Sequence, residues 1–321
     1  MTYFGCFLIA IILPISGILE GNPLFAVTLV LVSLSSLATT ILQKSLYGFL
    51  STFPATYMQA FLVGQGFSGL TISSIYLLLK VTNDFDLPSV KSFVAALYFG
   101  LTLFFVCVAL LCFLYFKGTS LYKEQLKQIA EQKNNLVASP ALNGLGTVFG
   151  QIQFYAVSSF CVFALTMIMV NYIYWIEPIS QSVSYYFIVC SFLLFDIGDV
   201  AGRILPSMKP NFRNLNIIAY LSWSRFLMIP VFMFSNVRDS RLPIFIKSDT
   251  LAMLLAFLTG FSKGYLGSMF LINTPKKVQA RNRESVGIIL TLTLIWGICF
   301  GSFVVFAFKS IHCLCNPFIQ N

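Results

Sequence analysis

Long apolar stretches follow one another along nearly the whole chain, separated by short polar segments. Each stretch has about 20 residues, the length that a helix needs to cross about 30 Å of hydrocarbon. The stretches are continuous and do not alternate with polar residues, which favours helices over a barrel of strands. The pattern therefore predicts nine transmembrane helices, near residues 3–19, 24–43, 54–79, 92–116, 151–175, 182–205, 215–236, 250–274 and 286–308.

Composition agrees with this pattern. The 321 residues are 58% hydrophobic and 10% charged, with a mean hydropathy of +0.85, which excludes a soluble globular domain. The fold class expected is an all-α polytopic membrane protein with the lipid bilayer as its surroundings. The net charge of +9 is spread over short loops and forms no basic patch interleaved with aromatic residues, so we expect no nucleic acid partner.

The longest polar stretch, residues 117–150, separates four predicted spans from five. We interpret it as a cytosolic linker between an N-terminal bundle, residues 1–116, and a C-terminal bundle, residues 151–321. A central linker between two bundles is typical of transporters whose halves rock about a site near the bilayer midplane. A cytosolic linker also places most of the basic loop residues on the cytosolic side, among them Lys276, Lys277 and Arg283.

One predicted span carries three charges in the segment FLLFDIGDVAGRIL. Ionisable residues at membrane depth are costly and usually functional, so Asp196, Asp199 and Arg203 form the first candidate site. Asp199 and Arg203 are four residues apart and can pair on one helix face. The alternative is an Arg203 side chain that extends to the membrane surface with two incidental acids nearby.

The Gly198-Asp199 pair also resembles the Gly-Asp element of intramembrane aspartyl proteases. Such enzymes need two carboxylates that face each other across helices and share a proton. Asp196 lies on the same helix as Asp199, and no other predicted span holds an acid. We therefore expect the chain not to be an enzyme.

Two further charges, Lys263 and Arg225, lie within apolar spans. Counted from the predicted helix starts, Lys263 and Asp196 have similar depths, and we hypothesise that they form an interhelical ion pair. Three pairs of glycines with three residues between them indicate close helix packing. They are Gly198 with Gly202, Gly260 with Gly264, and Gly297 with Gly301.

The cysteines predict neither a disulfide framework nor a metal centre. Six of the eight lie within predicted spans, where we interpret them as small packing residues. His312, Cys313 and Cys315 cluster at the tail, but so few candidate ligands at a chain end are weak support for a metal. We expect no metal and no cofactor.

Several motifs together resemble the equilibrative nucleoside transporter family. Phe195, Asp199, Gly202 and Arg203 match its Phe-Asn-x-x-Asp-x-x-Gly-Arg signature, with Asp196 in place of Asn. The segment FPATYMQAFLVGQGFSG resembles the family's Pro-x-x-Tyr followed by Gly-Gln-Gly. Its matching residues are Pro54, Tyr57, Gly64, Gln65, Gly66 and Gly69, and further matches occur at Gln43, Arg225 and Pro230. Lys263 stands where the family commonly has Asn.

The resemblance implies a facilitator for nucleosides or nucleobases that works by alternating access, with helix bundles like those of the major facilitator superfamily. It also implies substrate contacts from Gln43, Asp199 and Arg203. We assign structural or gating roles to Tyr57, Gly64, Gln65, Gly66, Asp196, Lys263 and Arg225. Proton coupling is a variant, motivated by the intramembrane acids, and the plasma membrane is the expected location.

The nine spans correspond to the third through eleventh of the family's eleven helices, so its first two helices have no counterpart in the sequence. The second functional hypothesis follows from this difference. In it, the chain is a truncated or non-transporting relative that acts as an assembly or regulatory partner. Two further apolar spans encoded upstream of Met1 would favour transport.

Overall fold

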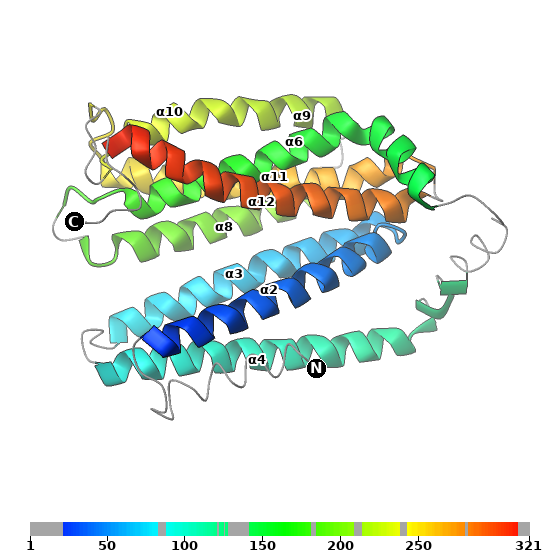
Figure 1. Ribbon diagram of the computed structural model, residues 1–321, viewed down its shortest axis with the longest axis horizontal. Coiled ribbons are helices and arrows are strands. Elements are labelled where there is room, and N and C mark those ends of the chain that lie inside the picture. Colours follow the sequence, from blue (N-terminus) through cyan, green and yellow to red (C-terminus); the bar gives the residue numbers. More distant parts are fainter. Residues whose placement is uncertain are drawn as a thin grey trace. The chain divides into compact units, whose positions relative to one another are not determined.

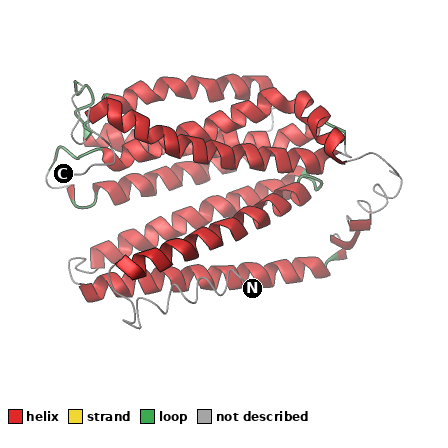
Figure 2. Ribbon diagram, viewed as in Figure 1, coloured by secondary structure: helices red, strands yellow, loops and turns green. Residues whose placement is uncertain are grey.

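The computed structural model describes residues 22–82, 88–120, 122–124, 126–127, 141–180, 184–208, 214–237, 243–279 and 282–313. Helices make up most of these residues, and short loops join them (Figure 2). Within these ranges the extended backbone is limited to two isolated bridges, Ile176 with Val237 and Ser235 with Ile246. Figure 1 labels the main helices, α2 (Asn22–Leu50), α3 (Ala55–Thr82), α4 (Pro88–Gly118), α6 (Ala141–Trp175), α8 (Phe187–Met208), α9 (Leu215–Ser224), α10 (Met228–Met233), α11 (Asp249–Asn273) and α12 (Arg283–Cys313).

The all-α membrane fold predicted from the sequence is confirmed. Seven segments of the described chain are helical, long and apolar enough to cross a membrane. The predicted span at 182–205 corresponds to α8, which differs from those seven because it carries three charged side chains. The predicted span at 3–19 lies outside the described residues.

The span at 215–236 is a helix with an internal irregularity. Asn214 caps its start by accepting a hydrogen bond from the backbone N–H of Asn216, at 3.2 Å. A short 3₁₀ segment, Arg225–Leu227, then joins α9 to α10. Pro230 follows in α10 and has no backbone N–H to donate, which explains why the regular α-helical pattern is interrupted one turn earlier.

The chain forms two compact units. One contains residues 1–46 and 78–140, and the other contains residues 47–77 and 141–321. Most of α3 therefore belongs to the same unit as α6 and the helices that follow it. The expected division into bundles at residues 116 and 151, with a cytosolic linker between them, stays a prediction.

The core of the second unit is built around α6, which packs against α9, α11 and α12 (Figure 1). Three clusters of buried apolar side chains fill the spaces between these helices. Tyr172 and Phe232 lie at the centre of one cluster and are fully buried. Tyr47 and Leu62 bring the end of α2 and the middle of α3 into another.

Close backbone contact joins α8 to α11 along the predicted glycine pairs. A Cβ added at Gly198 would contact the carbonyl oxygen of Phe257, and one added at Gly260 would contact that of Phe195. Gly202 and Gly264 are equally crowded, which confirms their packing role. Gly198 contacts Phe257, and Gly202, one turn later, contacts Phe261. The contacts therefore advance along both helices together, and α8 and α11 run in the same direction.

Candidate functional site

Helix α8 places its charged residues inside the second unit. Asp199 is 4% exposed and Arg203 is 8% exposed, so both are buried in protein. Asp196 is half-buried one turn earlier. This burial does not fit the alternative in which Arg203 extends to the membrane surface.

The carboxylate of Asp199 lies between two cations. Its Oδ2 accepts a hydrogen bond from Arg203 Nε at 2.9 Å, within the same helix. Its Oδ1 is 3.4 Å from the ammonium of Lys263 on α11. Lys263 also lies 5.1 Å from the ring centre of Phe195, where it makes a cation–π contact. The close approach of α8 and α11 therefore places a buried charge cluster between them.

Helix α3 fixes the other side of the Arg203 guanidinium. Nη1 donates to the Leu62 carbonyl oxygen and to Gln65 Oε1, each at 3.0 Å. The Tyr47 hydroxyl donates to the same Gln65 oxygen at 2.8 Å. Gln59 donates its amide N–H to the Arg203 carbonyl oxygen. Helices α8 and α3 thus hold this side chain directly, and Tyr47 of α2 holds Gln65.

One donor group of Arg203 is left for another molecule. Nε and Nη1 are occupied, whereas Nη2 makes no hydrogen bond to any residue that the structure describes. A guanidinium held in place by its other nitrogens loses little freedom when Nη2 binds an acceptor. The pair can therefore offer an oriented donor beside a carboxylate acceptor, a combination suited to hydroxyl groups.

The glycines of the Gly-Gln-Gly segment have different surroundings. A Cβ at Gly66 would lie 2.9 Å from Arg203 Cδ and 3.2 Å from Val200 Cγ2. Gly64 has no atom within 4 Å of that position among the described residues. Gly66 therefore leaves the space in which the arginine lies, whereas Gly64 has no such contact.

The hypothesis that Asp196 pairs with Lys263 is wrong. Lys263 pairs with Asp199, and Asp196 accepts a hydrogen bond from the Ser73 hydroxyl of α3. The error came from the helix start, because α8 begins at Phe187 and not near residue 182. When depth in the membrane is counted from this later helix start, Asp199, and not Asp196, lies near the level of Lys263, since the two helices run in the same direction.

Asp196 instead faces α3. A Cβ added at Gly69 would lie 3.1 Å from Asp196 Oδ1, so the small residue makes room for this carboxylate. The Ser73 hydroxyl thus donates a hydrogen bond to this acid, and Gly69 leaves the space that its side chain occupies.

Arg225 has a separate environment. It is 2% exposed, and its guanidinium donates to the carbonyl oxygens of Val162 at 2.7 Å and Thr259 at 3.4 Å. These bonds join the 3₁₀ segment to α6 and α11. Arg225 therefore connects helices and does not belong to the charge cluster around Asp199.

The remaining candidates lie on α2 and α3. Gln43 is half-buried on α2, one turn before Tyr47, but it belongs to the other compact unit, and its substrate role stays a prediction. Tyr57 lies in the first turn of α3, where its ring packs edge-on against Phe53 with a centroid distance of 5.8 Å. In the described part of the chain, no three His, Cys, Asp or Glu side chains form a group that could hold a metal.

The sequence patterns did not reveal one face of α3. Five residues on this face follow a spacing of three and four, the repeat of one helix face, and all five lie against α8. They are Gln59, Leu62, Gly66, Gly69 and Ser73. The recurrence of small and polar residues at this spacing is the signal that could have identified Gln59 and Ser73 as partners of α8. Tyr47 lies four residues after Gln43 and so on the same face of α2, which could have identified it as a further candidate for the site.

Comparison with known proteins identifies the family of this chain. A family model described as nucleoside transporter matches residues 28–139 and 130–310. Equilibrative nucleoside transporter 2 of Homo sapiens is 28% identical over 337 residues, which cover 91% of this chain and 74% of that protein. Equilibrative nucleoside transporter 1 of Homo sapiens is 25% identical, with 91% of this chain and 71% of that protein covered.

A plant relative extends the comparison. Equilibrative nucleotide transporter 1 of Arabidopsis thaliana is 24% identical, and the match covers 87% of this chain and 63% of that protein. The family model covers both the α3 segment and the charged α8 helix, the elements that build the site around Arg203. The chain therefore belongs to the nucleoside transporter family, and it is a multi-pass membrane protein of a transporter class and not an enzyme.

Proposed function

We propose that this chain is a facilitative carrier for nucleosides and nucleobases that works by alternating access of helix bundles. The observation that carries the proposal is the buried Asp199–Arg203 pair of α8, which side chains and backbone of α3 and Lys263 of α11 contact, with one guanidinium nitrogen left over. A buried ion pair contributes little to stability on its own, so such an arrangement is better explained by a ligand.

The chemistry of the pair suits a ribose ring. A carboxylate accepts hydrogen bonds from hydroxyl groups, and a guanidinium donates to hydroxyl or carbonyl oxygens. We assign the Gln43 amide to the base, because an amide can pair with the donors and acceptors along a base edge. Gln65 and Tyr47 are assigned the role of positioning Arg203.

Uptake of labelled uridine or adenosine into transport-deficient cells tests the proposal. Cells that express the chain at their surface should take up label faster than control cells, and an excess of unlabelled nucleoside should reduce the rate. Labelled hypoxanthine tests whether nucleobases are carried as well. A flat time course with correctly folded surface protein would reject carrier function and favour the assembly or regulatory role.

Proton coupling is a variant of this proposal, motivated by the additional acid Asp196 on α8. Uptake should then rise as the external pH falls, since protons would enter with the substrate. The matched variant is Asp196→Asn, which restores the residue usual in the family and should remove this pH dependence. Uptake by the unmodified chain that is insensitive to external pH would reject coupling.

The plasma membrane is the proposed location, and surface labelling would test it.

A further inference from the structure

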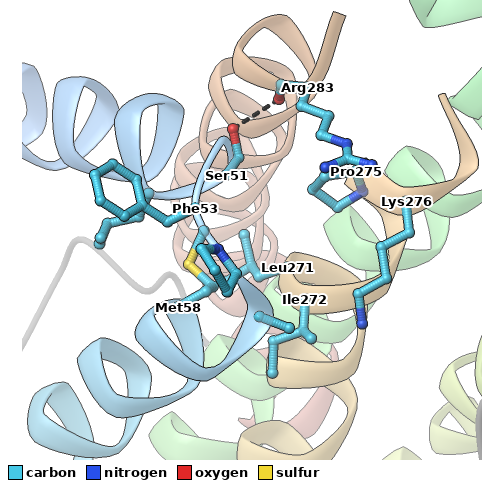
Figure 3. Close-up of a pocket in the computed structure, with 11 residues that line it drawn as sticks. Ser51, Phe53, Met58, Leu271, Ile272, Pro275, Lys276 and Arg283 are labelled. Atoms are coloured by element: carbon cyan, nitrogen blue, oxygen red, sulfur yellow. Dashed lines mark hydrogen bonds between the residues drawn. The ribbon is translucent and has the colours of Figure 1, made fainter. Parts of the chain in front are cut away.

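A pocket separate from the charge cluster lies where four helix ends meet. It is formed by the turn between α2 and α3 and by the segment that joins α11 to α12, all within one compact unit. Its volume is about 240 Å³. Figure 3 shows side chains from these two segments around it, with Ser51, Phe53 and Met58 on one side and Pro275, Lys276 and Arg283 on the other.

The lining of the pocket has two chemical parts. Phe53, Met58, Leu271 and Ile272 provide an apolar wall, whereas Lys276 and Arg283 provide two positive charges. No acidic side chain lies among the residues that line the pocket. An occupant that satisfies both parts has an anionic group joined to an apolar body.

Arg283 is positioned and incompletely satisfied. Its carbonyl oxygen accepts a hydrogen bond from the Ser51 hydroxyl at 2.7 Å, which ties the start of α12 to the end of α2 (Figure 3). Its Nε is buried and has no hydrogen-bond partner in the described structure. Such a buried donor without an acceptor is costly unless an additional molecule supplies one.

Two helix starts strengthen the positive potential of the pocket. α3 begins at Ala55 and α12 begins at Arg283, and both residues line the pocket. The first turn of a helix has free N–H groups and carries a partial positive charge, which favours an anion. These features agree with the charges of Lys276 and Arg283 but do not by themselves define a site.

The position of the pocket along the membrane helices identifies the class of ligand. Both segments that form it connect apolar spans, so the pocket lies at a membrane–water boundary. The distribution of basic residues predicts that this end lies on the cytosolic side, and the proposal adopts this orientation. Anionic phospholipids are concentrated in the cytosolic leaflet, and basic pockets between helices bind their headgroups.

We propose that this pocket binds the headgroup of an anionic phospholipid. Arg283 and Lys276 contact the phosphate, and the adjoining apolar wall contacts the start of the acyl chains. A bound lipid would join the α2–α3 turn to the α11–α12 segment, in addition to the hydrogen bond between Ser51 and Arg283.

The test uses the full purified chain in detergent, with binding measured by native mass spectrometry. Dioleoylphosphatidylserine is titrated against dioleoylphosphatidylcholine, and we expect a preference of about tenfold or more for the anionic lipid. Arg283→Gln should reduce that preference about fivefold, the factor expected for the loss of one basic contact, and the double variant Arg283→Gln, Lys276→Gln should bind the two lipids about equally.

Lys277→Gln is the matched control. Lys277 is exposed and adjacent to Lys276 but does not line the pocket, so it makes no contact with a bound headgroup and its loss should change the preference less than about twofold. An equal loss in Lys277→Gln and Arg283→Gln would show general surface attraction and overturn the proposal. Equal binding of the two lipids by the unmodified chain would also overturn it.

A third titration separates a lipid from a free anion. Inorganic phosphate in large excess should displace little phosphatidylserine, because it lacks the apolar contacts. Displacement at equal concentration would show a site for soluble anions and contradict the lipid proposal. The melting temperature of each lipid-free variant is measured alongside, and if Arg283→Gln does not fold, Lys276→Gln is compared with Lys277→Gln.

Discussion

Two helix–helix contacts in the second unit, which we call seams, both depend on pairs of glycines but differ in the polar side chains beside them. Gly198, Gly202, Gly260 and Gly264 bring α8 against α11, and Gly297 and Gly301 bring α12 against the backbone of α6. The first seam places Asp199, Arg203 and Lys263 beside one another. In the second, the hydroxyls of Thr291 and Ser302 bond only to carbonyl oxygens of their own helix, both at 2.8 Å.

The difference shows that close helix packing does not depend on charged side chains beside the contact. Glycines permit contact between helix backbones in lipid, where small residues provide most of the packing advantage. They do not decide what lies beside the contact. The charged seam is a candidate site because α3 contributes Leu62 and Gln65 to Arg203, and the uncharged seam serves packing.

The largest contrast between the seams should come from their polar side chains. Arg203→Ala or Asp199→Ala should reduce nucleoside uptake about 100-fold or more, because hydrogen bonds to a buried charge are lost and the partner remains buried. Thr291→Val in the uncharged seam is the control and should keep uptake within about twofold, since its hydroxyl bonds only to the Gly287 carbonyl of its own helix. Uptake per surface molecule is the measurement. Normal uptake by both charge variants would refute their substrate roles.

Packing should be equally sensitive in both seams. Gly260→Ala and Gly301→Ala would each place a Cβ against a carbonyl oxygen of the opposite helix, of Phe195 and Ala164 respectively. We expect each to cost about 1–3 kcal/mol, the usual range for overpacking, and to lower the melting temperature in detergent. Gly64→Ala, with open space around its Cβ, is the control. A melting temperature unchanged by either seam variant would argue against tight helix contact there.

The two glycines of α3 sharpen the comparison within a single segment. Gly66→Ala should reduce uptake about tenfold, because its Cβ would displace the Arg203 side chain and weaken its hydrogen bond to Gln65. Gly64→Ala should leave uptake unchanged. Dose-dependent uptake of uridine measures both variants at matched surface amounts. Equal effects at the two positions would mean that the segment acts through its backbone and not through Arg203.

The smallest effect is expected at Lys263. Its ion pair with Asp199, at 3.4 Å, is longer than the 2.9 Å bond from Arg203, so Asp199 retains its main partner in Lys263→Asn. We expect a change in uptake of about threefold or less, because Asp199 keeps its charge-assisted hydrogen bond from Arg203. Substrate affinity, obtained from the concentration dependence of uptake, is the more sensitive readout. A loss as large as that of Arg203→Ala would mean that Lys263 itself contacts the substrate.

The sequence alone determined the class of the protein and the chemistry of the charged helix. Stretches of about 20 apolar residues leave helices as the simplest way to satisfy the backbone in lipid, and eight of the nine predicted spans correspond to described helices. The spacing of four residues between Asp199 and Arg203 predicted their ion pair, because helix geometry is local. The glycine pairs were identified as packing residues for the same reason.

Only the tertiary structure decided which residues of other helices contact the charged side chains of α8. Lys263 was assigned to Asp196 from counted depths, and an error of five residues in one helix start sufficed to select the wrong acid. Gln59 and Ser73 on α3 were missed because a contact between helices distant in sequence depends on their relative rotation and height, which periodicity does not fix. The pocket around Arg283 likewise exists only because two remote turns meet.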